Sequence, residues 1–127
     1  MKVRAFNGSP RKEWNTATLL RHALQGAASQ GAETELIHLY DLHYTGCVSC
    51  FACKRKGSTS YARCAVQDAL TQPLALAVAA DAIIIGAPIY IGAVTGMMQA
   101  FIKRLIFPFA GRQDNRHIIH AFMNTVG

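Results

Sequence analysis

The segment Asp81-Ala-Ile-Ile-Ile-Gly-Ala-Pro88 constrains the fold more than any other part of the sequence. Its apolar residues do not alternate with polar ones, so both faces of the predicted strand should be buried. Strands of this kind lie at the centre of parallel sheets that carry helices on both faces. The chain has 127 residues, of which 51% are hydrophobic, which is enough for one such domain. We therefore predict a single α/β domain over residues 1–127.

The other predicted elements alternate between strands and helices. Asn15 or Thr16 is expected to cap the first helix, and Thr95 the third. Pro73 lies inside the second helix, so either its first turn is tight or the regular helix starts near Gln72. The alternation predicts a doubly wound parallel sheet. Strands are predicted over residues 2–6, 33–39, 81–88 and 117–123, and helices over residues 15–30, 67–80 and 95–107.

The first strand leads into a turn whose composition favours phosphate binding. Asn7-Gly8-Ser9-Pro10-Arg11 precedes the first helix, whose N-terminus attracts anions. The turn lacks the glycine pattern of dinucleotide sites and the Gly-Lys-Ser/Thr of triphosphate sites. Ser9, Asn15 and Thr16 offer hydroxyl and amide groups, and Arg11 offers a charge, which suits the phosphate of a mononucleotide. The alternative is an ordinary strand-to-helix turn.

A second segment, residues 87–95, is apolar where loops are usually polar. We predict that Pro88, Ile89, Tyr90, Ile91 and Gly92 form an apolar wall suited to a flat, partly polar ring, with Gly92 allowing close backbone approach. The alternative is a buried loop with a structural tyrosine. In doubly wound sheets ligands bind beyond the carboxyl ends of the strands, where residues 7–16 and 87–95 are expected to meet.

These segments resemble the flavodoxin-like NADPH-dependent FMN reductases, including their iron–sulfur flavoprotein branch. The resemblance rests on residues 7–12 with Asn15-Thr16, on residues 81–90 and on residues 95–105. It implies a flavodoxin-like fold that binds FMN and often dimerises. By this resemblance, the FMN phosphate would be held by Ser9, Arg11, Asn15 and Thr16, and the ribityl chain and flavin ring would be bordered by Pro88, Ile89, Tyr90, Ile91 and Gly92.

The resemblance also implies an activity. Hydride would pass from NAD(P)H to the flavin and on to a small-molecule electron acceptor, such as a flavin or a quinone. The flavin does this chemistry, so no protein acid or base is expected to be catalytic. One alternative is a non-enzymatic FMN electron carrier, and another is a truncated, flavin-free remnant.

The four cysteines lie in an irregular region predicted over residues 40–66. Cys47, Cys50 and Cys53 have a compact ligand spacing, and Cys64 could add a fourth thiolate. They resemble the cluster segment of the iron–sulfur branch, although the gap between Cys53 and Cys64 is longer than usual there. Reduced or redox-active thiols are expected, with a [4Fe–4S] cluster or a zinc site as alternatives. A structural disulfide is not expected in a reducing cytosol.

Flavodoxin-like domains normally have five parallel strands, and the sequence predicts four before Gly127. A C-terminally truncated domain without the fifth strand and last helix is therefore expected. Thr125 and Gly127 are candidates for a third flavin contact. The last predicted strand would be an apolar sheet edge, which favours pairing with another chain, so we expect either a homodimer or weak flavin binding.

Charge and hydropathy exclude other function classes. The net charge is +6, but the basic residues are scattered and are not interleaved with aromatic ones, which disfavours nucleic acid as a partner. The longest apolar stretches are too short to cross a bilayer, so no membrane partner is expected. The N-terminus has no apolar signal core before its first turn. A cytoplasmic location is therefore predicted.

Overall fold

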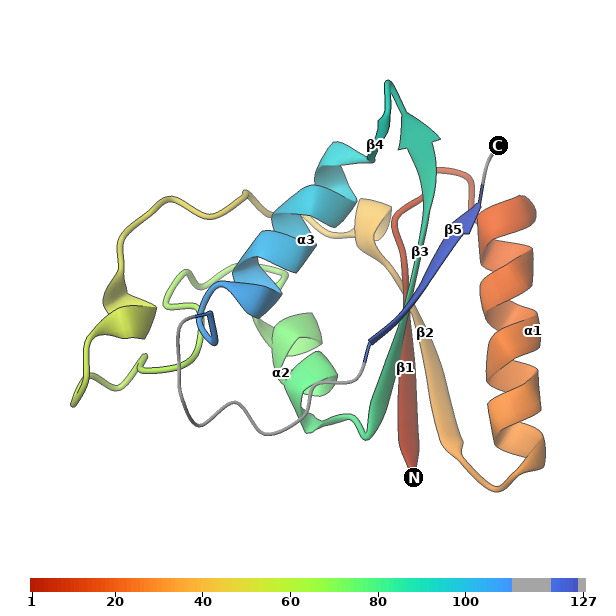
Figure 1. Ribbon diagram of the computed structural model, residues 1–127, viewed down its shortest axis with the longest axis horizontal. Coiled ribbons are helices and arrows are strands. Elements are labelled where there is room, and N and C mark those ends of the chain that lie inside the picture. Colours follow the sequence, from red (N-terminus) through yellow and green to blue (C-terminus); the bar gives the residue numbers. More distant parts are fainter. Residues whose placement is uncertain (111–119, 126–127) are drawn as a thin grey trace.

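The structure, a computed structural model, describes residues 1–110 and the backbone of residues 120–125. Strands and helices alternate along the chain (Figure 1). Two 3-10 helices, η1 (Leu39–Asp41) and η2 (Ala52–Lys54), precede the second α-helix. The elements are β1 (Lys2–Asn7), α1 (Asn15–Ser29), β2 (Glu33–His38), α2 (Thr71–Ala79), β3 (Ala82–Tyr90), β4 (Ala93–Val94), α3 (Gly96–Ile106) and β5 (His120–Thr125).

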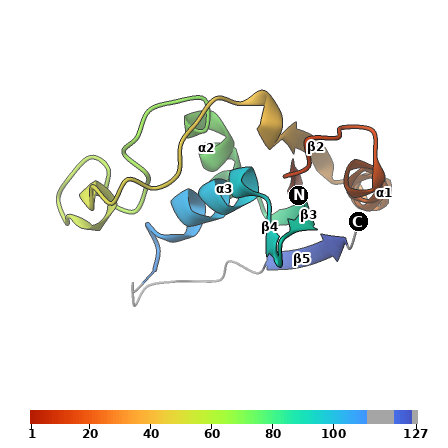
Figure 2. The same ribbon diagram turned by 90° about the horizontal axis from the view of Figure 1, so that it is seen from above.

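Four of the strands form a parallel sheet in the order β2-β1-β3-β5, and the short β4 pairs antiparallel with the end of β3. Helix α1 covers one face of this sheet, and α2 and α3 cover the other (Figure 2). The doubly wound parallel sheet predicted from the sequence is therefore confirmed. Strand β3 lies between β1 and β5, the central position that its apolar composition indicated.

Each face of the sheet has its own apolar core. Val3 and Ala5 of β1 point toward α1, where they pack with Leu20 and Leu24. Phe6 points to the opposite face and stacks on Phe101 of α3, with the ring centroids 4.4 Å apart. Because successive strand residues alternate between faces, both faces of β3 are lined by apolar residues, and its sequence is a continuous apolar run. Strand β1 carries one charged residue, Arg4, which is buried and paired with Glu33 and Glu35.

Several predicted boundaries change. Strand β3 continues to Tyr90, so residues 88–90 are extended and do not begin a loop. Helix α2 starts at Thr71, one residue before Gln72, with Pro73 in its first turn, which agrees with the later of the two predicted starts. Strand β5 ends at Thr125, two residues beyond the predicted end, and residues 117–119 lie outside the described residues.

The region between η1 and α2 carries the cysteines and extends away from the sheet on the side of α2 and α3 (Figure 1). Over residues 1–110 and 120–125, no helix combines the length and apolar character that crossing a membrane requires.

Candidate functional site

The turn after β1 is held by its own polar groups. The Gly8 amide donates to the Gly86 carbonyl at 2.8 Å, which extends the pairing of β1 with β3 by one residue. The Ser9 amide donates to Asn7 Oδ1 at 2.9 Å, and the Arg11 amide donates to Ser9 Oγ at 3.1 Å. Ser9 is buried, and among the described residues its hydroxyl only accepts, which leaves its hydrogen to donate to a ligand. The turn is therefore preorganised before any ligand arrives.

Helix α1 begins differently from the prediction that Asn15 or Thr16 caps it. The N-cap is Trp14, and within the described residues its side chain makes no capping hydrogen bond. Asn15 and Thr16 are the first two helical residues, the former exposed and the latter buried. The first-turn amides of a helix have no partner within the helix, so an N-terminus without a side-chain cap is suited to an anion. The correction therefore strengthens the case for an anion at this turn.

Arg11 lies on the surface beside this helix start. Its guanidinium carbon is 4.3 Å from the centroid of the Trp14 ring, a cation–π contact, and Trp14 is largely exposed. Arg11 therefore places its charge at the rim of the turn. Its predicted role toward a phosphate stays a prediction, as do those of Ser9, Asn15 and Thr16.

The second predicted segment is a β-hairpin. Pro88, Ile89 and Tyr90 end β3, and a two-residue turn of Ile91 and Gly92 leads into β4. Both turn residues have positive φ, 48° and 74°, as the tight turn of a two-residue hairpin requires. Ile89 and Tyr90 are exposed and Ile91 is completely so. The alternative of a buried loop is wrong for these three residues, because the hairpin carries them beyond the end of the sheet.

The two segments meet at the carboxyl ends of β1 and β3, as predicted. Thr95 Oγ1 donates to the Gly8 carbonyl at 2.6 Å and also accepts from the Met98 amide at 3.3 Å, capping α3. A Cβ added at Gly8 would lie 2.8 Å from Met98 Cβ and 3.1 Å from Ala87 Cβ, so only glycine fits between them. Thr95 was expected only as a cap, and its contact with Gly8 is visible only in the structure.

The residue predicted to make a third flavin contact lies at the same edge of the sheet, beside the carboxyl end of β3. Thr125 is the register partner of Pro88 in the pairing of β5 with β3, so the end of β5 lies beside the end of β3. Gly127 lies outside the described residues. Asn7 and His38, the last residues of β1 and β2, are register partners at this edge and were not among the predicted site residues. Asn7 directly precedes Gly8 at the start of the turn, and this position could have identified it as a site residue. Nothing near His38 in the sequence indicated a role.

All four cysteines line one pocket beyond α3. Cys47 and Cys50 are exposed, Cys53 is buried and Cys64 is half-buried, and all four thiols are free. Burial raises the pKa of the Cys53 thiol. Within the described part of the chain, no three His, Cys, Asp or Glu side chains are grouped closely enough to hold a metal ion. The rest of the pocket lining is Val48, Phe51, Ala65, Val66, Lys103, Arg104, Phe107 and Pro108.

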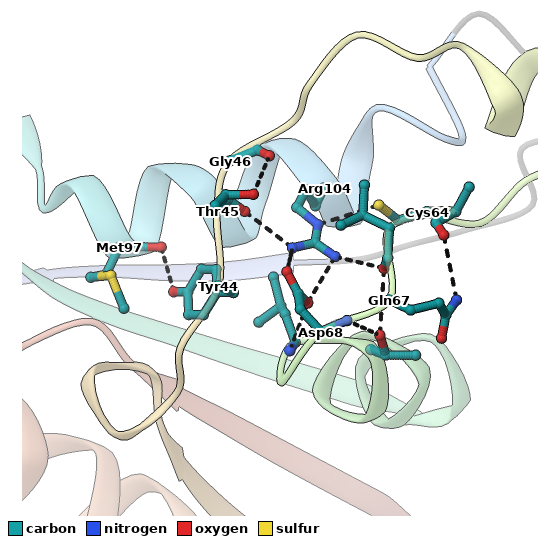
Figure 3. A network of polar contacts seen from close by, with 12 residues as sticks. Tyr44, Thr45, Gly46, Cys64, Gln67, Asp68, Met97 and Arg104 are labelled. Atoms are coloured by element: carbon teal, nitrogen blue, oxygen red, sulfur yellow. Dashed lines mark hydrogen bonds and ion pairs between the residues drawn. The ribbon is translucent and has the colours of Figure 1, made fainter.

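A buried ion pair attaches this region to α3 (Figure 3). Arg104 Nη1 and Nη2 donate to the two carboxylate oxygens of Asp68 at 2.6 and 3.1 Å, and Nε donates to Cys64 Sγ at 3.3 Å. The same two terminal nitrogens donate to the carbonyls of Thr45 and Val66 at 3.1 and 3.0 Å. All five guanidinium donors are thus used. Burial opposes ionisation of Asp68, but the hydrogen bonds from Arg104 hold its pKa below the usual 3.8.

Asp68 also stands at the boundary of α2, where its Oδ1 accepts from the Leu70 amide at 3.0 Å. Nearby, the Tyr44 hydroxyl donates to the Met97 carbonyl at 2.7 Å, and burial raises the pKa of this tyrosine. The cysteine region is therefore joined to α3 by hydrogen bonds at both of its ends.

Comparison with known proteins gives a consistent picture. The family model for NADPH-dependent FMN reductases matches residues 1–127. An iron–sulfur flavoprotein of Archaeoglobus fulgidus is 37% identical over 127 residues, covering 100% of this chain and 60% of that protein. An iron–sulfur flavoprotein of Methanocaldococcus jannaschii is 38% identical over 104 residues, covering 82% of this chain and 51% of that protein. The chain thus spans about half of the length of these relatives.

Solved structures agree on the fold. The apo form of an NADH:FMN oxidoreductase has a TM-score of 0.59 at 25% identity, covering 87% of this chain and 54% of that one. A flavone reductase has a TM-score of 0.61 at 21% identity, covering 98% of this chain and 43% of that one. The fold is therefore flavodoxin-like. From the family match over its whole length, this chain belongs to the NADPH-dependent FMN reductase family.

Proposed function

We propose that this chain binds FMN and acts as an NAD(P)H-dependent oxidoreductase that reduces a flavin, a quinone or a similar small acceptor. The observation that carries the proposal is the junction of the turn after β1 with the β3–β4 hairpin, held by the bond from Thr95 to the Gly8 carbonyl. Family membership and the fold of the NADH:FMN oxidoreductase support it. Bound FMN would supply the hydride and electron transfer.

The residues divide into two groups around this junction. The buried Ser9 hydroxyl and the first turn of α1, with Asn15 and Thr16, are proposed to hold the phosphate, and Arg11 adds charge at the rim. The ribityl chain and ring are proposed to lie along Pro88, Ile89, Tyr90, Ile91 and Gly92, with Thr125 on the β5 side. The exposure of the hairpin's apolar side chains supports this placement, because a flat ligand would cover them.

The test compares FMN with riboflavin, which lacks the phosphate. FMN is titrated into the purified protein, and NADPH or NADH is then added without oxygen while the flavin absorption is followed. Ser9→Ala is expected to weaken FMN binding about tenfold, since it removes a hydrogen bond to a charged group, and to leave riboflavin binding unchanged. Thr18→Ala, an exposed hydroxyl further along α1, is the matched control. A protein that takes up no FMN contradicts the proposal.

A second candidate is an FMN electron carrier with an iron–sulfur cluster. It is favoured because Cys47, Cys50, Cys53 and Cys64 line one pocket and because relatives are described as iron–sulfur flavoproteins. Four thiols are the donor set of a [4Fe–4S] cluster, although among the described residues they are not grouped around a metal position, so they would have to converge.

The carrier is distinguished by two measurements. A flavin that dithionite or a protein donor reduces, and NAD(P)H does not, supports the carrier. Iron and sulfide are measured after anaerobic reconstitution, and Cys64→Ser should abolish both if a cluster forms. Free thiols without iron support the expected reduced or redox-active cysteines.

We further propose a homodimer in the cytoplasm. The exposed apolar side chains of Ile89, Tyr90 and Ile91 support association with a second copy, and the four free thiols are compatible with a reducing compartment. Light scattering of the FMN-loaded protein should give twice the chain mass, and Ile91→Asp should lower it. A monomer with tightly bound FMN contradicts the dimer and leaves the flavin proposal intact.

A further inference from the structure

The orientation of the Asn7 amide is dictated by the main chain. Asn7 ends β1 and is completely buried. The Ser9 amide lies 2.9 Å from Asn7 Oδ1, and a backbone N–H can only donate, so the side-chain oxygen must face Ser9. The amide nitrogen Nδ2 must then face the other way, toward His38 on the neighbouring strand.

This orientation determines the protonation state of His38. Asn7 Nδ2 lies 3.0 Å from His38 Nδ1, and because Nδ2 only donates, Nδ1 must accept. The imidazole is therefore neutral and carries its hydrogen on Nε2. Protonation of His38 would place a hydrogen on Nδ1, facing the N–H of Asn7 Nδ2. The hydrogen bond between these two nitrogens would then be lost. Burial agrees with this state, since it lowers the pKa of His38 below the usual 6.5.

The charged groups around His38 come from three elements. Lys12 and Glu13 belong to the turn before α1, Arg21 to α1 and Asp41 to η1. They pair with one another: Lys12 Nζ lies 2.5 Å from Asp41 Oδ1, and Arg21 binds both carboxylate oxygens of Glu13 at 3.0 and 2.8 Å. Because each cation is paired with an anion, their effects on His38 oppose one another. Burial is therefore the main cause of the lowered pKa of His38.

We propose that neutral His38 is a positioning residue for the anion-binding turn, and this rests on the proposed binding of FMN. His38 holds Asn7, Asn7 holds the Ser9 amide, and the Ser9 hydroxyl holds the Arg11 amide. Protonation of His38 releases the first bond of this chain and weakens phosphate binding. The protein therefore loses affinity for FMN as the pH falls through the folded-state pKa of His38, which lies below 6.5.

Nitrogen NMR of the flavin-free protein tests the first link. At neutral pH, His38 is expected to show hydrogen on Nε2 and a bare Nδ1, and the Ser9 and Arg11 amide signals should shift together with His38 as the pH is lowered. Hydrogen on Nδ1 at neutral pH, or a Ser9 amide that does not follow His38, overturns the proposal. This measurement needs no ligand, so it decides whether His38 positions the turn even if FMN binding fails.

The second test measures FMN affinity between pH 8 and pH 5. His38→Asn places an amide oxygen near the position of Nδ1, which accepts from Asn7 and takes up no proton. Loss of one neutral hydrogen bond predicts a decrease of about fivefold at low pH in the wild type, absent in His38→Asn. His22→Asn, an exposed histidine of α1, should keep the wild-type profile.

The phosphate of FMN also titrates near pH 6, but all three proteins experience that change equally. The informative quantity is therefore the difference between the wild type and His38→Asn. Identical profiles for these two proteins overturn the proposal.

Discussion

Replacing Arg104 with methionine should destabilise the protein and loosen the cysteine region. The guanidinium has no solvent exposure, and the Asp68 side chain is 19% exposed. Methionine fills much of the same space, but it removes the guanidinium hydrogen bonds to the Asp68 carboxylate and to the carbonyls of Thr45 and Val66. The variant therefore isolates the polar network from simple loss of volume.

The expected magnitude follows from the burial of the two partners. Removing one member of a buried ion pair costs roughly 3–5 kcal/mol. Arg104→Met should fall at the lower end, about 3 kcal/mol, because Asp68 keeps some water contact. Asp68→Asn should cost about the same, since it leaves a fully buried guanidinium without a counter-charge. The double variant should cost about 4 kcal/mol, less than the sum, because the second change removes a group that is already unpaired.

Urea unfolding at pH 7 measures these differences in unfolding free energy. They appear as a shift of the unfolding midpoint while the slope of free energy against urea concentration stays constant. Hydrogen exchange should accelerate over residues 44–68 more than in β1 or β3. Lys103→Met, the exposed neighbour on α3, is the matched control and should change stability by less than about 0.5 kcal/mol. If the losses of unfolding free energy in the two single variants add up in the double variant, the reasoning is refuted. It is also refuted if neither single variant loses more than Lys103→Met.

Acid should weaken the same pair. The folded-state pKa of Asp68 is depressed, so its contribution is complete above its usual value of 3.8 and is lost as the pH falls through the folded-state value. The difference in unfolding free energy between wild type and Arg104→Met should therefore shrink below pH 3.8.

Three other substitutions test the binding edge. Gly8→Ala should lower the melting temperature and weaken FMN binding, because the new Cβ would lie 2.8 Å from Met98 Cβ. Gly26→Ala is the control and should be neutral or stabilising, because a Cβ there meets nothing within 4 Å. Ile91→Gly should raise the unfolding free energy by about 1 kcal/mol, since it relieves a β-branched residue at positive φ that buries no surface; unchanged urea stability would contradict this. Thr95→Val should cost about 1–2 kcal/mol by removing the α3 cap and the bond to Gly8, and Thr95→Ser should restore most of it.

Local patterns predicted the sheet and its order of elements well. A continuous apolar run marked β3, and a short apolar run interrupted by Arg4 marked β1, because both faces of these strands are covered by helices. Thr95 was identified as an N-cap because the capping bond to Met98 spans only three residues. The position of the candidate site at the ends of β1 and β3 followed from the topology of parallel sheets.

Other features depend on residues that are distant in the sequence. Ile89 and Tyr90 were expected in a loop but belong to β3, where they pair with β4, and Pro88 just before them pairs with Thr125, 37 residues later. Arg104 stands in the last turn of α3, where an arginine is usually solvated, and its burial depends on Asp68, 36 residues earlier.

The sequence by itself determined the α/β class, the alternation of strands and helices along the chain and the edge at which a ligand would bind, because these depend on local periodicity and on the few ways parallel strands connect. Only the tertiary structure decided which polar groups meet at that edge. Asn7 and His38 are 31 residues apart, and they become neighbours because parallel pairing of β1 and β2 brings both strand ends into register. Such contacts leave no local pattern, since each residue alone is compatible with many surroundings.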